Sequence, residues 1–181
     1  GMENRCFASI DEVDDISSRD EYQVCLEAGL SPAEAMEVVS RYSRDNARTP
    51  FQWSGEENGG FTTGKPWLGL NENYREINLE QQRNDPDSLF AFYQKLIGLR
   101  KDPEYRDTVV YGKTEPVLEE ESGIMAYFRQ GEGQRILVAG NFGQEERLIR
   151  IDGVDKGSFR LLLSNGGEPV LDERGMVLEG V

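Results

Sequence analysis

The chain has 181 residues, carries 20 Lys and Arg against 34 Asp and Glu for a net charge of −14, and contains no histidine. This charge argues against binding to nucleic acid or to an anionic membrane, because both surfaces would repel the protein unless it kept a separate basic patch. The lack of histidine excludes Ser-His-Asp and Cys-His nucleophilic sites and His-ligated metal sites. The chain is also shorter than the about 250 residues of a complete (β/α)8 barrel.

The longest uncharged apolar run, Ile136 to Ala139, is far shorter than the ~20 residues of a membrane-spanning helix. No secretory leader is recognisable, and Cys6 and Cys25 are interpreted as reduced thiols because two cysteines without such a leader seldom form a disulfide. We therefore expect a cytoplasmic protein with no membrane partner, no metal and no other cofactor.

Two helices are predicted near the start of the chain. Ser18 to Glu21 resembles a capping box that begins a helix, and Gly29 is suited to end it. A second capping box follows, in which Ser31 is the N-cap, Pro32 the first helical residue and Glu34 the third, so a helix is predicted to about Arg41.

A third helix is predicted to open at Asp85-Pro86-Asp87 and to end before Pro103. Its apolar residues recur at helical spacing: Leu89, Phe92, Tyr93, Leu96 and Ile97. We expect this strong apolar stripe to be buried against another element.

After Tyr105 the pattern changes to short β-type runs separated by turn residues. Strands are predicted over Val109–Tyr111, Pro116–Leu118, Ile124–Arg129, Arg135–Phe142, Arg147–Ile151 and Phe159–Leu163. This spacing favours a small antiparallel sandwich. We expect a domain boundary near Asp102–Glu104, which separates residues 1–102 from residues 103–181.

The acidic run from Asp11 to Asp15 lacks the alternating ligands and central glycine of a calcium-binding loop, so it is interpreted as a solvated turn.

The segment from Arg44 to Glu80 is rich in Gly and Pro and holds both tryptophans, Trp53 and Trp67. An aperiodic connection of this length is usually functional or disordered, and its aromatic residues argue against disorder. Its first part brings together Arg44, Asp45, Arg48 and Trp53. Guanidinium groups suit vicinal hydroxyls, and a tryptophan offers a face to a sugar ring. The alternative is an Arg–Asp network that only braces the loop around a buried Trp53.

The blocks Arg44–Trp53, Asn58–Trp67 and Asn71–Glu80 together resemble a long signature of the α-glucosidases of glycoside hydrolase family 13, the group of oligo-1,6-glucosidase, dextran glucosidase and trehalose-6-phosphate hydrolase. The resemblance covers essentially the whole chain but only about the last third of such an enzyme. It implies an α+β fold, in which the last loop and helix of a (β/α)8 barrel are followed by an antiparallel β-sandwich.

The resemblance also implies retaining hydrolysis of terminal α-linked glucose, with a nucleophilic Asp and an acid/base Glu on earlier barrel strands. None of these catalytic residues can be placed in this chain. Arg44 resembles the arginine that helps to bind the terminal glucose, whereas Asp45, Arg48 and Trp53 are expected to brace the loop.

We therefore expect the C-terminal part of an α-glucosidase that is inactive without its N-terminal barrel segment. The alternative is a carbohydrate-binding or structural module that works with a separately encoded barrel. An exposed apolar helix or an open sheet edge would favour self-association.

Overall fold

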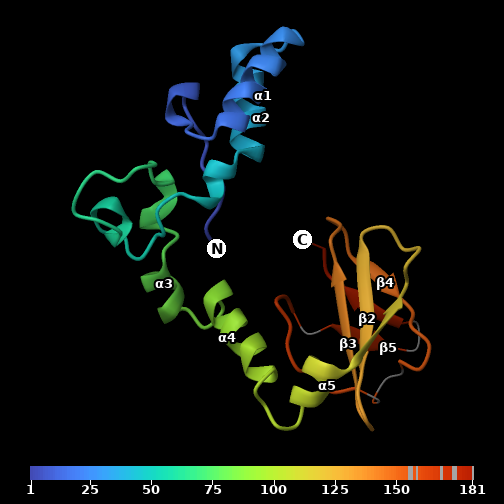
Figure 1. Cartoon of the computed structure of the whole chain (residues 1–181). Helices are drawn as coiled ribbons and strands as arrows, with labels where there is room; N and C mark the ends of the chain where they lie inside the picture. The colour runs from blue at the N-terminus through green and yellow to red at the C-terminus, as the bar shows by residue number, and fades with distance from the viewer. Residues whose placement is uncertain (155–156, 158, 168, 173–174, 181) are drawn as a thin grey trace. The chain divides into compact units, whose positions relative to one another are not determined.

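The computed structural model describes residues 1–154, 157, 159–167, 169–172 and 175–180 (Figure 1). By their internal contacts the residues form two compact units, 1–91 and 92–181. Among the described residues, none of the helices has the length and hydrophobicity needed to cross a membrane.

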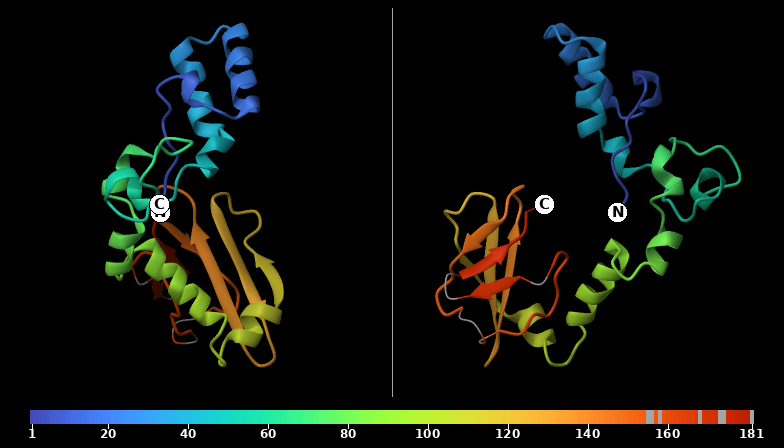
Figure 2. Two further views of the ribbon diagram at one scale, coloured as in Figure 1. Left: turned by 60° about the vertical axis from the view of Figure 1, so that its left-hand side comes forward. Right: turned by 180° about the vertical axis from the view of Figure 1, so that it is seen from behind.

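The first unit is made of short helices joined by ordered loops (Figures 1 and 2). Its α-helices are α1 (Ile16–Glu27), α2 (Pro32–Tyr42) and α3 (Leu79–Asn84), and α4 (Leu89–Leu99) begins at its end. Its 3-10 turns are η1 (Ile10–Glu12), η2 (Arg44–Ala47), η3 (Glu57–Gly60) and η4 (Glu72–Arg75). Helices α1 and α2 lie side by side as an antiparallel hairpin.

The predicted start of the first helix was wrong. The N-cap of α1 is Asp15, whose carboxylate accepts the backbone N–H of Ser18, so the cap lies three residues before the expected one. The predicted end is confirmed, because Gly29 follows the C-cap Ala28 with a φ of 92°, a conformation that glycine adopts without strain.

The capping box of α2 is confirmed. Ser31 Oγ accepts the backbone N–H of Glu34, and the Glu34 carboxylate in turn accepts the backbone N–H of Ser31 at 2.8 Å. Behind this cap the helix buries Ala35 and Val39. Val39 completes a small core with Phe7 and Val13, against which Ile10, Tyr22 and Met36 are partly buried.

The apolar stripe of α4 is not buried as expected. Leu89, Tyr93, Leu96 and Ile97 are all exposed, by between 39% and 61%. The helix also begins later than predicted, at Leu89. The Ser88 hydroxyl accepts the backbone N–H of Ala91 at 3.1 Å and so performs the capping expected of the upstream aspartates.

The second unit contains α5 (Arg106–Tyr111) and two three-stranded antiparallel sheets (Figure 2). The first sheet has the order β1-β2-β3, with strands Lys113–Val117, Ile124–Gln130 and Arg135–Asn141. The second has the order β4-β6-β5, with β4 at Arg147–Ile149, β5 at Val170–Asp172 and β6 at Gly175–Leu178. Asn141 at the end of β3 donates to the Leu178 carbonyl of β6 at 3.3 Å and links the sheets.

Four of the six strand predictions correspond to β1–β4, and two were wrong. Residues 109–111 form the last turn of α5, where the Val109 N–H donates to the Tyr105 carbonyl at 2.8 Å. Residues 159–163 form no strand. The structure instead has β5 and β6, which the sequence reasoning missed because neither shows a long β-branched run.

Candidate functional site

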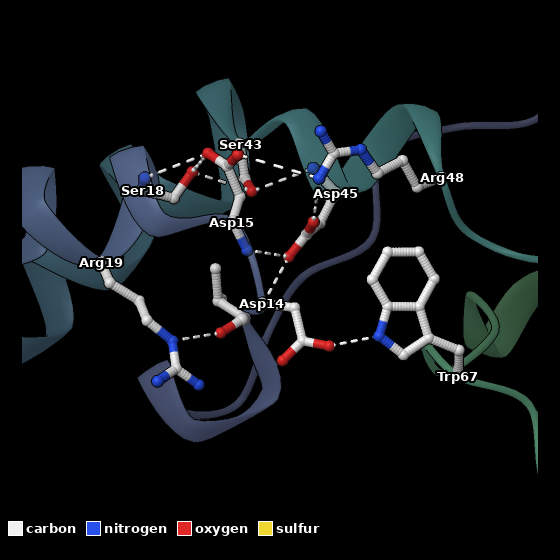
Figure 3. A network of polar contacts seen from close by, with 9 residues as sticks. Asp14, Asp15, Ser18, Arg19, Ser43, Asp45, Arg48 and Trp67 are labelled. Atoms are coloured by element: carbon white, nitrogen blue, oxygen red, sulfur yellow. Dashed lines mark hydrogen bonds and ion pairs between the residues drawn. The ribbon is translucent and has the colours of Figure 1, made fainter.

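The carboxylate of Asp45 is completely buried and organises the start of the long loop (Figure 3). Its Oδ2 accepts the backbone N–H groups of Asp14 at 2.7 Å and Asp15 at 3.0 Å. Its Oδ1 lies 3.4 Å from Nη1 of Arg48. A buried carboxylate needs such partners because its desolvation is otherwise costly. Asp45 therefore joins η2 to the segment before α1, thirty residues earlier.

Asp15 is the second buried carboxylate of this network. Its Oδ2 accepts the Ser18 hydroxyl at 2.8 Å, and its Oδ1 lies 3.8 Å from the same Arg48 guanidinium. The interpretation of residues 11–15 as a solvated turn is therefore only partly right: Asp11 and Asp14 are exposed, whereas Asp15 is not. The signal that sequence reasoning missed was the spacing Asp15-x-x-Ser18, which is that of an N-cap.

The local sequence explains why Asp45 turns inward. Ser43 ends α2 and also caps η2, since its hydroxyl accepts the Asp45 N–H at 3.2 Å. The short 3-10 turn that follows has about three residues per turn, so Asp45 and Arg48 lie on the same face. Arg44 is left on another side of this turn.

Arg44 is exposed and forms no side-chain hydrogen bond or ion pair with the part of the chain that the structure describes. The neighbouring Asp45 carboxylate has its own partners, so it does not neutralise Arg44. A guanidinium in this state keeps all its N–H donors for an incoming group with paired oxygens, such as vicinal hydroxyls.

Trp53 lies apart from the ionic network. The residue is 51% exposed, and its ring contacts Phe51, with the two ring centroids 4.6 Å apart and the planes inclined by 60°. The alternative of a buried Trp53 is therefore wrong. The backbone N–H of Trp53 donates to the Gly59 carbonyl at 2.8 Å, so the residue belongs to the fold of the loop through its main chain.

Trp67 was not among the candidate residues, yet it contacts the network directly. Its indole N–H donates to the Asp14 carboxylate, although residues 14 and 67 are far apart in the chain (Figure 3). Asp14 in turn donates its backbone N–H to Asp45. A residue in the second half of the long loop is therefore joined to the same network as the loop's beginning.

Three or more Cys, Asp or Glu side chains arranged to hold a metal ion are not found among the described residues. The arrangement supplies hydrogen-bond donors and aromatic surface, which can orient a polyhydroxylated ligand. Its two buried carboxylates, Asp15 and Asp45, are already engaged by backbone N–H groups, the Ser18 hydroxyl and Arg48.

Comparison with known proteins gives the family of this site. Residues 7–112 match the model of the alpha-amylase catalytic domain. The chain belongs to the alpha-amylase family, glycoside hydrolase family 13. The resemblance seen in the sequence is thereby confirmed. The matched region contains Arg44, Asp45 and Trp67, and it ends just before β1.

Relatives in this family are similar over most of the chain. A probable oligo-1,6-glucosidase of Bacillus subtilis is 39% identical over 165 residues, and the trehalose-6-phosphate hydrolase of the same species is 39% identical over 168. Each match covers 91% of this chain and 29% of the relative. The chain therefore spans about three tenths of the length of these alpha-amylase family proteins.

Solved structures of related enzymes are also similar to this chain over nearly its whole length. The trehalose-6-phosphate hydrolase of Bacillus licheniformis superposes with a TM-score of 0.87 at 38% identity, and an isomaltulose synthase from Klebsiella does so with 0.81 at 30%. Both alignments cover 98% of this chain but only 32% and 31% of the other protein.

Proposed function

We propose that this chain is the C-terminal part of a retaining α-glucosidase that removes terminal α-linked glucose from small oligosaccharides. Membership of the alpha-amylase family and the similarity to oligo-1,6-glucosidases support this proposal. Residues 1–102 would supply the last loop and helix of the barrel. Residues 103–181, with their two antiparallel sheets, would supply a C-terminal β-sandwich domain.

Arg44 is the residue that we assign to glucose binding. The single observation that carries this role is that Arg44 is exposed and unpaired among the described residues, beside an aspartate that is completely buried and fully engaged. Asp45 and Arg48 would act as positioning residues, because they hold the turn from which Arg44 projects. Trp53 would brace the loop mainly through its backbone hydrogen bond.

The chemistry requires free carboxyl groups, whereas the described carboxylates of the Arg48 network, Asp15 and Asp45, are buried and already hydrogen-bonded. A retaining glycosidase needs a carboxylate nucleophile and a carboxylic acid about 5–5.5 Å apart on either side of the scissile bond. Arginine and tryptophan orient a sugar but provide neither group. The chain alone is therefore proposed to be inactive, with the catalytic carboxylates on an N-terminal barrel segment.

A chimaeric enzyme tests the proposal. The segment of the Bacillus cereus oligo-1,6-glucosidase that aligns with this chain, at 40% identity over 167 residues, would be replaced by the chain itself. Hydrolysis of isomaltose and of an aryl α-glucoside is expected from the chimaera and not from the 181-residue chain. Arg44→Ala in the chimaera should lower kcat/KM by at least about a hundredfold, the loss of a charged hydrogen-bonding partner in the transition state.

Arg83→Ala is the matched control, because Arg83 is another exposed arginine of the first unit without a side-chain partner among the described residues. It should leave kcat/KM unchanged. A folded chimaera in which Arg44→Ala and Arg83→Ala behave alike would overturn the role of Arg44. Turnover by the chain alone would overturn the proposed division of the catalytic groups. Cytoplasmic location and self-association through α4 or a sheet edge stay predictions.

A further inference from the structure

A hollow of about 580 Å³ lies on the loop that follows Trp53. It is lined by Glu56, Glu57, Gly60, Phe61, Thr62 and Thr63. The hollow is shallow and open to solvent, so a sugar bound to it would keep part of its surface in water. We propose that this hollow binds one glucose unit of a neutral oligosaccharide. The residues are separate from the Asp45 network and from Arg44, so the proposal does not depend on the role given to Arg44.

The first support is the aromatic surface at the hollow. Phe61 is 51% exposed, and the neighbouring Phe51 and Trp53, whose rings contact each other at an inclined angle, are also exposed. Gly60, which lines the hollow, also lies beside Trp53, since a Cβ placed on Gly60 would lie 3.6 Å from the Cβ of Trp53. Exposed rings on a polar loop are unfavourable in water, and a flat ring matches the C–H face of a pyranose.

The second support is a set of free hydrogen-bonding groups beside this aromatic surface. The carboxylates of Glu56 and Glu57 and the hydroxyl of Thr63 have no side-chain partner among the described residues. The Thr62 hydroxyl accepts the Gly64 N–H at 3.1 Å and can still donate. Carboxylate acceptors and hydroxyls next to an apolar ring suit the edge and the face of a sugar at the same time.

The third support is that the backbone of the hollow is set in advance. Asn58, Gly59 and Gly60 have φ values of 52°, 63° and 66°, a left-handed run that favours glycine and tolerates asparagine. The Asn58 side-chain amide donates to the carbonyls of Thr62 and Gly64, each at 3.2 Å. A site with this built-in shape loses little conformational freedom on binding.

Charge selects a neutral sugar over a phosphorylated one. The lining residues include two carboxylates and no basic side chain, and Lys65, the next cation along the chain, does not line the hollow. A sugar phosphate would meet repulsion from both carboxylates, strengthened by the net charge of −14. Neutral maltose and isomaltose oligosaccharides fit these groups best.

The 181-residue chain labelled with ¹⁵N tests the proposal directly. Maltotriose and isomaltotriose, titrated to about 20 mM to detect millimolar dissociation constants, should shift the amide signals of residues 56–63 and change the fluorescence of Trp53. Phe61→Ala should weaken binding by at least about fivefold through loss of the aromatic contact. Glu56→Gln, which keeps the shape of the side chain, should weaken it by a smaller factor.

Phe142→Ala is the matched control, because Phe142 is an exposed phenylalanine of the second unit. It should leave sugar binding unchanged. Maltose 6′-phosphate should bind more weakly than maltose, with a difference that shrinks at high salt. The proposal is overturned if neither trisaccharide shifts residues 56–63, if Phe142→Ala weakens binding as much as Phe61→Ala, or if the phosphorylated sugar binds more tightly.

Discussion

Arg48 and Asp45 form an ion pair in which one partner is half exposed and the other is completely buried. Nη1 of Arg48 lies 3.4 Å from Oδ1 of Asp45, and Oδ2 of the same carboxylate accepts two backbone N–H groups from residues 14 and 15. The pair therefore couples two segments that are distant in the chain. It makes the position of the Arg44 turn dependent on tertiary contacts.

Asp45→Ala should lower the free energy of unfolding by about 3–5 kcal/mol, because it leaves two backbone donors without acceptors and removes the buried partner of Arg48. Urea denaturation followed by circular dichroism measures the loss. Asp11→Ala, at an exposed position, should change the same free energy by less than about 0.5 kcal/mol. A cost for Asp45→Ala no larger than that of the control would contradict the role of the network.

A double-mutant cycle between Asp45 and Arg48 should give a modest coupling energy, about 0.5–1 kcal/mol. The Arg48 side chain is 36% exposed, so water screens its attraction to the aspartate. The backbone donors should thus account for most of the cost at Asp45. Thermal unfolding of Asp45→Asn, of Arg48→Met and of the double variant measures the coupling energy. A coupling energy above about 3 kcal/mol would mean that the ion pair, and not the N–H groups, dominates.

The capping box of α2 should make the stability of the first unit depend on pH in the acid range. Hydrogen bonds from the side chain and backbone of Ser31 hold the pKa of Glu34 below its ordinary value of 4.5. A lowered folded-state pKa adds stability above that ordinary value, and this stability is lost as the pH falls through the folded-state pKa. Ser31→Ala should remove this dependence and, through loss of the N-cap, should also lower stability at every pH.

Unfolding curves of the wild type and of Ser31→Ala between pH 7 and pH 3 check this prediction. The gap between them should narrow at the acid end without closing, because the bond from the Glu34 N–H to the Ser31 hydroxyl does not titrate. Glu37→Gln, an exposed substitution later in the same helix, is the control and should leave the difference intact. A gap between the curves that stays constant over the whole range would rule out a contribution from Glu34.

Two glycine substitutions should act in opposite directions. Gly59→Ala places a Cβ 2.6 Å from Cδ2 of Leu70 at a φ of 63°, so it should destabilise the chain by about 1–3 kcal/mol. Gly98 lies inside α4 with open space around its Cβ position, so Gly98→Ala should stabilise by about 0.5–1 kcal/mol. Thermal unfolding of both variants tests these two expectations. A change in stability of the same sign in both variants would contradict the argument from backbone conformation.

Local sequence signals were sufficient to predict secondary structure where the conformation of a short segment depends only on its own residues. The box from Ser31 to Glu34 predicts α2 because all its partners lie within four residues. Gly29 predicts the end of α1 for the same reason. The hairpin of β2 and β3 also follows from its own alternating residues and the turn between them.

Local signals failed where the deciding partner is far away in the chain. Asp15 rather than Ser18 caps α1, at a position held by the remote Asp45. Residues 109–111 look like a strand, yet they end a helix that contacts the first sheet, since Nη2 of Arg129 in β2 donates to the Val110 carbonyl at 3.4 Å. In such places packing outweighs the weak intrinsic preference of a few residues.

The sequence by itself determined the family, the capped helix α2 and the residues of the Arg44 segment. Family signatures and helix caps each depend on residues that lie close together in the chain. Only the tertiary structure decided which of these side chains are buried. It showed Asp45 enclosed, Arg44 exposed and the hollow beside Phe61 open. Burial depends on contacts between segments that lie tens of residues apart, and such contacts cannot be inferred from the pattern within one short segment.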